Sequence, residues 1–221
     1  MSTNKKALVT GASRGLGKAV ADRLAKEGFD VYRVARTGDV EFKGDLRDQY
    51  FRSHIISSIT PDLFINNAGI LSGSYDDVMG LNFVAAGHLL SHYYHAMPEG
   101  SDIINIASVA ANRIVKEGDP DYRVWYTSSK HAIKSLSTSL HLSRKRDVRV
   151  MCLEPGWINT DILTPIVPDK RVASRIANKE RAPMAPAYYA DMVWWCYNQP
   201  RWLTVVSFEL DQHWRINHDQ S

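Results

Sequence analysis

The sequence predicts an α/β protein, built on a doubly wound parallel sheet of about seven strands with helices on both faces in three layers. Two observations support this prediction. Short apolar segments alternate with longer helix-like segments along the chain, and the first apolar segment leads directly into a glycine-rich turn that opens a helix. The carboxyl ends of parallel strands share one edge of the sheet, so a ligand crevice is expected there.

Seven segments have the length and apolar character of strands. In chain order they are Lys6–Thr10, Val31–Ala35, Val40–Lys43, Asp62–Asn66, Asp102–Ala107, Val148–Glu154 and a last strand near Leu203–Leu210. The helix-like segments lie between them, with glycine or proline near the ends of the first two. They are Gly15–Glu27, Leu46–Ile59, about Asp76–Met97, about Val124–Arg146 and Ala187–Asn198.

Length and composition indicate a single domain over residues 1–221, with no repeat or linker that would divide it. The chain is 44% hydrophobic and 23% charged, and its net charge of +3 without a dense basic run argues against a nucleic-acid partner. No apolar stretch is long enough to span a membrane, and the polar N-terminus shows no signal peptide. Cys152 and Cys196 lie in apolar runs, as expected for core residues of a cytoplasmic protein.

The turn after the first strand carries the residues expected of a phosphate site. It comprises Thr10, Gly11, Ala12, Ser13, Arg14, Gly15, Leu16 and Gly17. Glycines let the backbone turn tightly and let a pyrophosphate approach, while the helix N-terminus offers unpaired N–H groups. A tight turn without a ligand is the alternative. The position of the turn between a strand and a helix favours dinucleotide binding.

The end of the second strand indicates which dinucleotide is bound. Sites for NAD usually place Asp or Glu there, to bond the ribose 2′-hydroxyl. This strand instead ends in Ala35 and Arg36, and a guanidinium holds a 2′-phosphate well. Arg14, inside the glycine loop, could reach the same phosphate. We therefore expect NADP(H) as the cofactor, the alternative being that both arginines are solvated surface cations.

Tyr126 and Lys130 are four residues apart near the start of a predicted helix, so they share one face. A free tyrosine has a pKa of about 10, too high for an efficient base near neutral pH. A nearby ammonium favours the phenolate, so Lys130 can adapt Tyr126 to give or take a proton. Such a pair is common on exposed helices, so a catalytic role for it is inferred only together with the surrounding motifs.

With its Thr-Gly-x-x-x-Gly-x-Gly loop and Tyr-x-x-x-Lys pair, the chain resembles the short-chain dehydrogenase/reductase family in its smaller, NADP-preferring form. The resemblance covers about residues 5–160 and implies a Rossmann-like fold. It also implies that Asp45 and Leu46 contact adenine, that Asn67 stabilises the sheet, and that Ala68 and Gly69 lie against the cofactor. The Asn66–Asn67 pair is otherwise explained as a strand-ending turn.

The same resemblance implies the rest of the catalytic group. Ser108, after the fifth strand, corresponds to the serine that bonds the substrate oxygen, and Asn82 to the helix asparagine that holds a water near Lys130. Ser108 could instead be a turn residue, and Asn82 a buried polar residue satisfied by backbone groups. The nicotinamide end of the cofactor is expected against four residues that follow the sixth strand: Pro155, Gly156, Ile158 and Thr160.

These observations favour an enzyme that transfers a hydride between NADP(H) and a small carbonyl or alcohol substrate, with Tyr126 as its acid/base. A non-catalytic NADP(H)-binding sensor or scaffold is the alternative from another class, and enoyl or pteridine reduction is an alternative reaction. The family resemblance implies a homo-oligomer, either a dimer or a tetramer. Residues 112–123 are expected to form a loop beside the site.

The segment 159–186 occupies the position of the family's substrate cover. Its net positive charge points weakly to an anionic substrate, although a solvated helix face is the commoner explanation. The basic residues are Lys170, Arg171, Arg175, Lys179 and Arg181. Three histidines, His88, His92 and His95, recur at helical spacing, and we expect a packing or surface role rather than metal binding because no further ligands accompany them.

Overall fold

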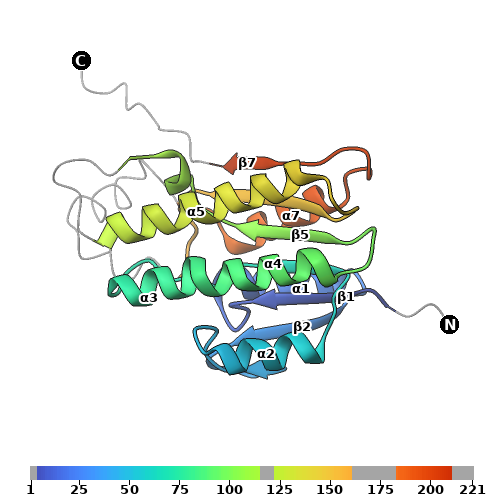
Figure 1. Cartoon of the computed structure of the whole chain (residues 1–221), viewed down its shortest axis with the longest axis horizontal. Coiled ribbons are helices and arrows are strands. Elements are labelled where there is room, and N and C mark those ends of the chain that lie inside the picture. Colours follow the sequence, from blue (N-terminus) through green and yellow to red (C-terminus); the bar gives the residue numbers. More distant parts are fainter. Residues whose placement is uncertain (1–3, 115–121, 161–182, 211–221) are drawn as a thin grey trace, which may run out of the picture.

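The computed structural model describes residues 4–114, 122–160 and 183–210. Its centre is a seven-stranded sheet in the order β3-β2-β1-β4-β5-β6-β7, in which every pairing is parallel (Figure 1). The strands are β1 (Lys6–Thr10), β2 (Asp30–Ala35), β3 (Phe42–Lys43), β4 (Leu63–Asn66), β5 (Asp102–Ile106), β6 (Arg149–Pro155) and β7 (Ser207–Leu210). The predicted fold class is confirmed.

Helices cover both faces of this sheet. They are α1 (Gly15–Lys26), α2 (Gln49–Ser58), α3 (Tyr75–Met79), α4 (Ala86–Ala96), α5 (Tyr122–Ser143) and α7 (Pro186–Tyr197), with a π-helical turn η1 (Gly80–Ala85) and a 3₁₀ turn η2 (Val109–Asn112). In Figure 1, α2, α4 and α5 lie in front of the sheet, and α1 and α7 lie behind it.

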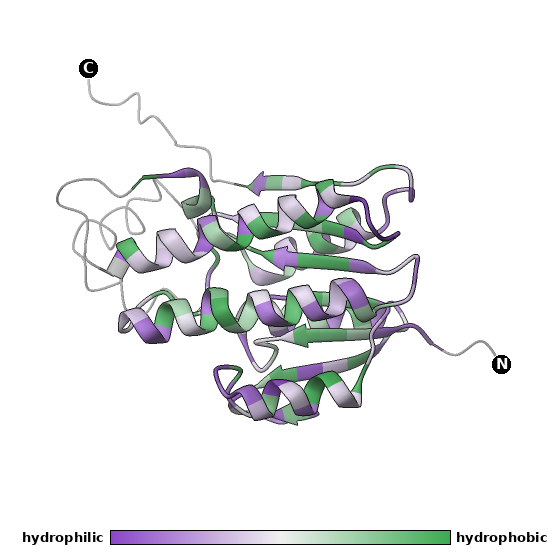
Figure 2. Cartoon of the chain, viewed as in Figure 1, coloured by the Kyte–Doolittle hydropathy of each residue, from purple (hydrophilic) through white to green (hydrophobic). Residues whose placement is uncertain are grey.

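Two hydrophobic cores form between the sheet and these helix layers. Consecutive residues of a strand point to opposite faces, so Leu8 joins the core beneath α2, α4 and α5, whereas Val9 joins the core beneath α1 and α7. Phe64 and Ile65 divide in the same way. This two-sided burial explains why the central strands are largely apolar, and the strand arrows in Figure 2 are mostly green with some purple bands.

The observed elements differ from the predicted ones at several places. The second helix begins at Gln49 rather than Leu46, because the Asp48 side chain caps it by accepting from the Tyr50 N–H. The last strand is only Ser207–Leu210. The long helix predicted over about 76–97 is not uniformly α-helical, since it takes the π form at Gly80–Ala85 between α3 and α4.

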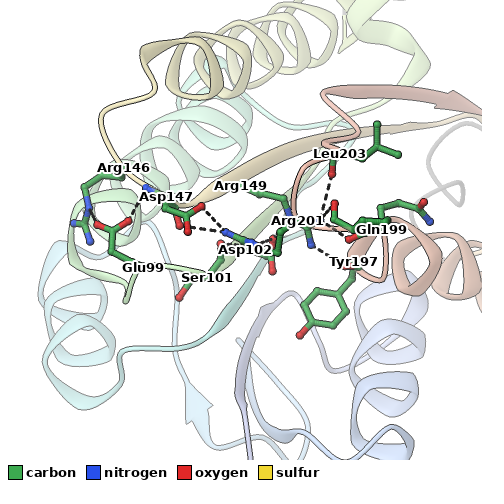
Figure 3. A network of polar contacts seen from close by, with 11 residues as sticks. Glu99, Ser101, Asp102, Arg146, Asp147, Arg149, Tyr197, Gln199, Arg201 and Leu203 are labelled. Carbon is green, nitrogen blue, oxygen red and sulfur yellow. Dashed lines mark hydrogen bonds and ion pairs between the residues drawn. The ribbon is translucent and has the colours of Figure 1, made fainter.

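At the amino ends of β5 and β6, a network of charged side chains joins the sheet to the end of α7 (Figure 3). The guanidinium of Arg149 pairs with the carboxylate of Asp102, and both side chains are buried. Arg149 also donates to the carbonyls of Tyr197 (2.7 Å) and Gln199 (2.8 Å), and Arg201 donates to Asp102 (2.9 Å). The network therefore holds this edge of the sheet to the segment leading into β7.

The described residues bear on three further predictions, which concern the two cysteines, membrane-spanning segments and the three histidines. Cys152 and Cys196 are both buried and free, as expected. None of the helices in the described ranges is long and apolar enough to cross a membrane. His88, His92 and His95 lie together on α4, and burial followed by the charges of the other two histidines lowers the pKa of His92. The described residues contain no cluster of three or more potential metal ligands.

Candidate active site

The glycine loop lies where the strand order reverses, between β1 and β4, at the carboxyl edge of the sheet. Gly11 and Gly15 have positive φ angles of 68° and 56°, which favour glycine. A Cβ atom at Gly17 would lie 2.2 Å from the Gly11 carbonyl oxygen, so no larger residue fits. Helix α1 begins at Gly15 without a side-chain cap and without an acidic residue in its first turn. Its first N–H groups therefore suit an anionic ligand such as a pyrophosphate.

Thr10 and Asn67 join the ends of β1 and β4 beneath this loop. The buried Thr10 hydroxyl accepts hydrogen bonds from the backbone N–H groups of Asn67 (2.9 Å) and Ala68 (3.0 Å). The Asn67 side chain donates in return to the Thr10 carbonyl (2.9 Å). These contacts join β4 to β1 and place Ala68 beside the glycine loop, where a Cβ atom at Gly11 would lie 2.9 Å from the Ala68 Cα.

The residues expected to select the cofactor lie on adjoining loops. Arg36 follows β2 and is exposed, and Arg14 is exposed at the start of α1. The Arg36 loop touches the glycine loop, because a Cβ atom at Gly38 would lie 3.0 Å from the Ser13 Cβ. The loop geometry thus brings both predicted arginines to the same end of β1 and β2.

Asp45, which the resemblance assigns to the adenine contact, forms an ion pair with Arg47. Its carboxylate accepts from Arg47 Nη2 at 2.7 Å, and Arg47 also pairs with Asp77 of α3. The hydrogen bond from Arg47, with a smaller effect of the Arg36 charge, lowers the pKa of Asp45. Leu46 is buried in the core. Sequence reasoning missed Arg47, although its place two residues after an acidic residue was a visible signal.

Asn82 is buried in the π-helical turn. Its side-chain oxygen accepts from the Ile70 N–H (2.9 Å), and its amide donates to the Ile70 carbonyl (2.8 Å) and to Ser129 Oγ (3.2 Å). A Cβ atom at Gly69 would lie 3.2 Å from Asn82 Oδ1 and 3.5 Å from Lys130 Nζ. Asn82 and Lys130 are therefore close neighbours, although the Asn82 side chain is satisfied as in the alternative interpretation. π-Helical turns are frequent at functional sites.

Ser108, Tyr126 and Lys130 come together at the carboxyl end of β5. Lys130 is buried, donates from Nζ to the Ile106 carbonyl (3.0 Å), and lies 5.7 Å from the centre of the Tyr126 ring. Burial lowers the pKa of Lys130 to about 8. Burial raises the pKa of Tyr126, and a hydrogen bond with Ser108 opposes that rise. The arrangement can hold and move a proton at the Tyr126 hydroxyl.

The segment after β6 returns to the glycine loop. The Gly156 N–H donates to the Leu210 carbonyl of β7 (2.6 Å), and the buried Ile158 forms a single parallel bridge with Met184. Thr160 reaches the glycine loop, since a Cβ atom at Gly15 would lie 3.2 Å from its methyl group. Pro155, the last residue of β6, thus begins a segment that reaches the glycine loop at Thr160.

Some predictions fall outside the described residues. Most of the expected substrate cover 159–186 does so, including all five basic residues behind the anionic-substrate hypothesis. The same holds for the middle of the expected loop 112–123. Of the two tyrosines that follow the cover, Tyr189 is buried in the core beneath α7, and Tyr188 is exposed.

Known proteins resemble both the sequence and the fold. The sequence model of the family described as short chain dehydrogenase matches residues 5–57 and 38–171. Dehydrogenase/reductase SDR family member 11 from Mus musculus is 29% identical over 193 residues, which cover 70% of this chain and 73% of that protein.

Two solved structures have a similar fold. A short chain dehydrogenase from Burkholderia cenocepacia J2315 in complex with NADP has a TM-score of 0.79 at 22% identity, covering 94% of this chain and 96% of that one. A 4-hydroxyisoleucine dehydrogenase complexed with NADH has a TM-score of 0.78 at 22% identity, covering 94% and 97%. At this level of identity, the likeness concerns the fold.

The class of protein follows from the family match together with the site. The chain is an oxidoreductase of a kind that uses a nicotinamide cofactor and acts on CH–OH or C=O groups. It belongs to the short-chain dehydrogenase family, because the family match spans most of the chain. The resemblance identified from the sequence is thereby confirmed.

Proposed function

We propose that the protein transfers a hydride between NADP(H) and a small carbonyl or alcohol substrate, with Tyr126 as general acid/base. The observation that supports this proposal most strongly is the convergence of three side chains. Lys130 Nζ lies 5.7 Å from the Tyr126 ring, and Ser108 bonds the Tyr126 hydroxyl. A protein that only bound the cofactor would have no use for this arrangement, which argues against a sensor or scaffold.

In this proposal, each residue of the group has a separate task. The bound cofactor supplies or accepts the hydride. Tyr126 donates its proton to the developing alkoxide in reduction, or removes the proton of an alcohol in oxidation. Ser108 bonds the substrate oxygen and stabilises its negative charge. Lys130, 5.7 Å from the Tyr126 ring, offers a positive charge that favours the phenolate formed when Tyr126 gives up its proton. Asn82, beside Lys130, holds a water that connects the lysine to solvent.

The residues proposed to hold the cofactor surround the glycine loop. The pyrophosphate would be bound by Thr10, Gly11, Ser13, Arg14, Gly15, Leu16 and Gly17, and the 2′-phosphate by Arg14 and Arg36. The adenine would contact Asp45 and Leu46, and the middle of the cofactor would lie against Asn67, Ala68 and Gly69. The nicotinamide end would be bound by Tyr126, Lys130, Pro155, Gly156, Ile158 and Thr160. The tight approach at Gly17 and the uncapped start of α1 support a phosphate ligand. The NADH complex of one structural relative makes the choice of cofactor a direct question for experiment.

We also propose that residues 1–221 form one domain in which the segment 159–186 covers the substrate. The sheet that draws strands from Lys6 to Leu210 supports a single domain. Association of several copies is proposed because the family commonly forms oligomers. A cytoplasmic location and an anionic substrate stay predictions of the sequence.

Tyr126→Phe tests the reaction. We expect turnover of NADPH with an accepted carbonyl substrate to fall by about 10²–10⁴-fold, because the proton donor is lost. The dissociation constant for NADPH, measured by fluorescence transfer from tryptophan, should change little. Tyr94→Phe, which alters a tyrosine far from the site on α4, is the matched control. Equal turnover in Tyr126→Phe and in the unaltered protein would refute the assignment.

Arg36→Asp tests the cofactor. Parallel titrations with NADPH and NADH should show that the unaltered protein prefers NADPH, because a guanidinium favours the 2′-phosphate. In the variant, the carboxylate repels that phosphate and can bond the free ribose hydroxyl, so the preference should move at least about tenfold toward NADH. A preference that does not move would remove Arg36 from the site.

A further inference from the structure

A second cluster of polar side chains lies next to the proposed catalytic group and has no part in the chemistry given above. It is centred on Glu154, a carboxylate in β6 that is fully buried at 0% exposure. Three side chains donate to it: Lys134 Nζ at 2.9 Å, the Asn112 amide, and the Ser207 hydroxyl. A carboxylate buried this deeply is costly unless paired and hydrogen-bonded, and here it is both.

Asn112 connects the cluster across elements. Its amide nitrogen donates to Glu154 and also to Glu209 of β7 (2.6 Å), while its oxygen accepts from Lys134. Glu154 and Glu209 are paired in the β6–β7 register. Asn112 and Lys134 thus hold two neighbouring carboxylates, and the cluster joins η2, α5, β6 and β7.

Each of the three central members lies within one helical turn of a proposed site residue. Asn112 ends η2, which starts directly after Ser108. Lys134 is one turn beyond Lys130 on α5, and Glu154 directly precedes Pro155 and Gly156. A shift of Asn112 or Lys134 would therefore move Ser108 or Lys130 with it, because short turns and helices transmit displacement as rigid units.

We propose that Glu154 is a positioning residue that, through Asn112 and Lys134, fixes Ser108 and Lys130 around the Tyr126 hydroxyl. This inference rests on the proposed function. It predicts an effect on the catalytic rate that a purely stabilising ion pair would lack. The Asp102–Arg149 pair offers the comparison, since it is a buried ion pair at the opposite ends of β5 and β6.

The first experiment compares kcat, KM and the dissociation constant for NADPH in Glu154→Gln, Asn112→Ala and the control Asp102→Asn. Misplacement of a catalytic group by about 1 Å can cost about 10²-fold. We expect kcat to fall about 10–100-fold in the first two variants, with KM and cofactor affinity changed less than about threefold. The control should lose thermal stability and keep its kcat. Unchanged kcat in Asn112→Ala, or an equal loss in the control, would overturn the proposal.

Asn112→Ala keeps the test decisive if Glu154→Gln fails to fold. Asn112 is exposed, and its removal leaves the Glu154–Lys134 ion pair in place.

A second measurement needs no substrate. In protein labelled with ¹³C at tyrosine Cζ, the resonance missing from Tyr126→Phe reports the hydrogen bonding of the Tyr126 phenol. Glu154→Gln and Asn112→Ala should shift this resonance, and Asp102→Asn should not.

The two measurements distinguish the failure of this inference from the failure of the proposed function. If the unaltered protein reduces no carbonyl with NADPH but the Tyr126 resonance moves in both variants, the proposed function is wrong and the positioning role stands. A Tyr126 resonance that is the same in all three variants would refute the positioning role, whatever the activity.

Discussion

Two buried cations at opposite edges of the sheet, Arg149 and Lys130, differ in how their charges are compensated. At the amino edge, Arg149 pairs with Asp102 and donates to several carbonyls, so its charge is compensated from many sides (Figure 3). At the carboxyl edge, Lys130 is as deeply buried, yet in the described part of the chain its ammonium donates only to the Ile106 carbonyl. The charge of Arg149 stabilises the fold, whereas the charge of Lys130 is weakly compensated, and burial lowers the pKa of Lys130 to about 8.

Arg149→Met should produce the largest change in stability. It leaves the Asp102 carboxylate buried without its main partner, and we expect a loss of about 3–5 kcal/mol in the free energy of unfolding. Denaturant unfolding followed by tryptophan fluorescence measures this loss. Arg201→Gln, which removes a partly exposed partner of the same carboxylate, should cost only about 1 kcal/mol. If both variants lost the same amount, the amino edge would not depend on the buried pair.

Lys130→Met should stabilise the protein while abolishing turnover. Burial lowers the pKa of Lys130 from 10.5 to about 8, which corresponds to a penalty of about 3 kcal/mol for the charged form. After the lost hydrogen bond to Ile106 is subtracted, we expect a gain of about 1–3 kcal/mol at pH 7.

The pH dependence of that gain has a definite sign. Below about pH 8, Lys130 is protonated in both the folded and the unfolded state, so the full penalty is present. As the pH rises from about 8 towards 10.5, the folded state loses its proton first and the penalty disappears. The advantage of Lys130→Met should therefore shrink over this range in unfolding experiments. A variant less stable than the unaltered protein at pH 7 would contradict the contrast between the edges.

The rate of carbonyl reduction should fall as the pH rises through about 8, the pKa of Lys130. Reduction needs a protonated Tyr126, and the positive charge of Lys130 supports proton transfer from it; above this pH, the ammonium is lost. The fall should approach tenfold per pH unit in kcat. Cofactor affinity, measured at each pH, separates this effect from weaker binding. A kcat that stays constant to pH 9.5 would show that Lys130 does not titrate as described.

The sequence was sufficient for the features that depend on local pattern. Glycines at fixed spacing and two-sided apolar runs predicted the strands and the tight glycine turn before α1, and the four-residue spacing predicted that Tyr126 and Lys130 are neighbours. These properties depend on residues close together in the chain.

Features that depend on distant residues could not be predicted in this way. The pairing of Arg47 with Asp77 and the union of Asn112, Lys134 and Glu154 depend on tertiary packing of several elements. The π form of the helix around Asn82 was also missed, because an amphipathic pattern with one additional residue still resembles an ordinary helix.

That additional residue has a consequence for how this helix is constructed. Successive residues of an α-helix are rotated by about 100°, so one residue in excess shifts the phase of everything that precedes it. Val78 of α3 and Leu89 of α4 are both buried, although the turn between them is irregular. The π turn therefore changes the helical phase between α3 and α4, so that each helix can direct its own apolar residues to the core. Asn82 lies in the π turn, where this change of phase occurs.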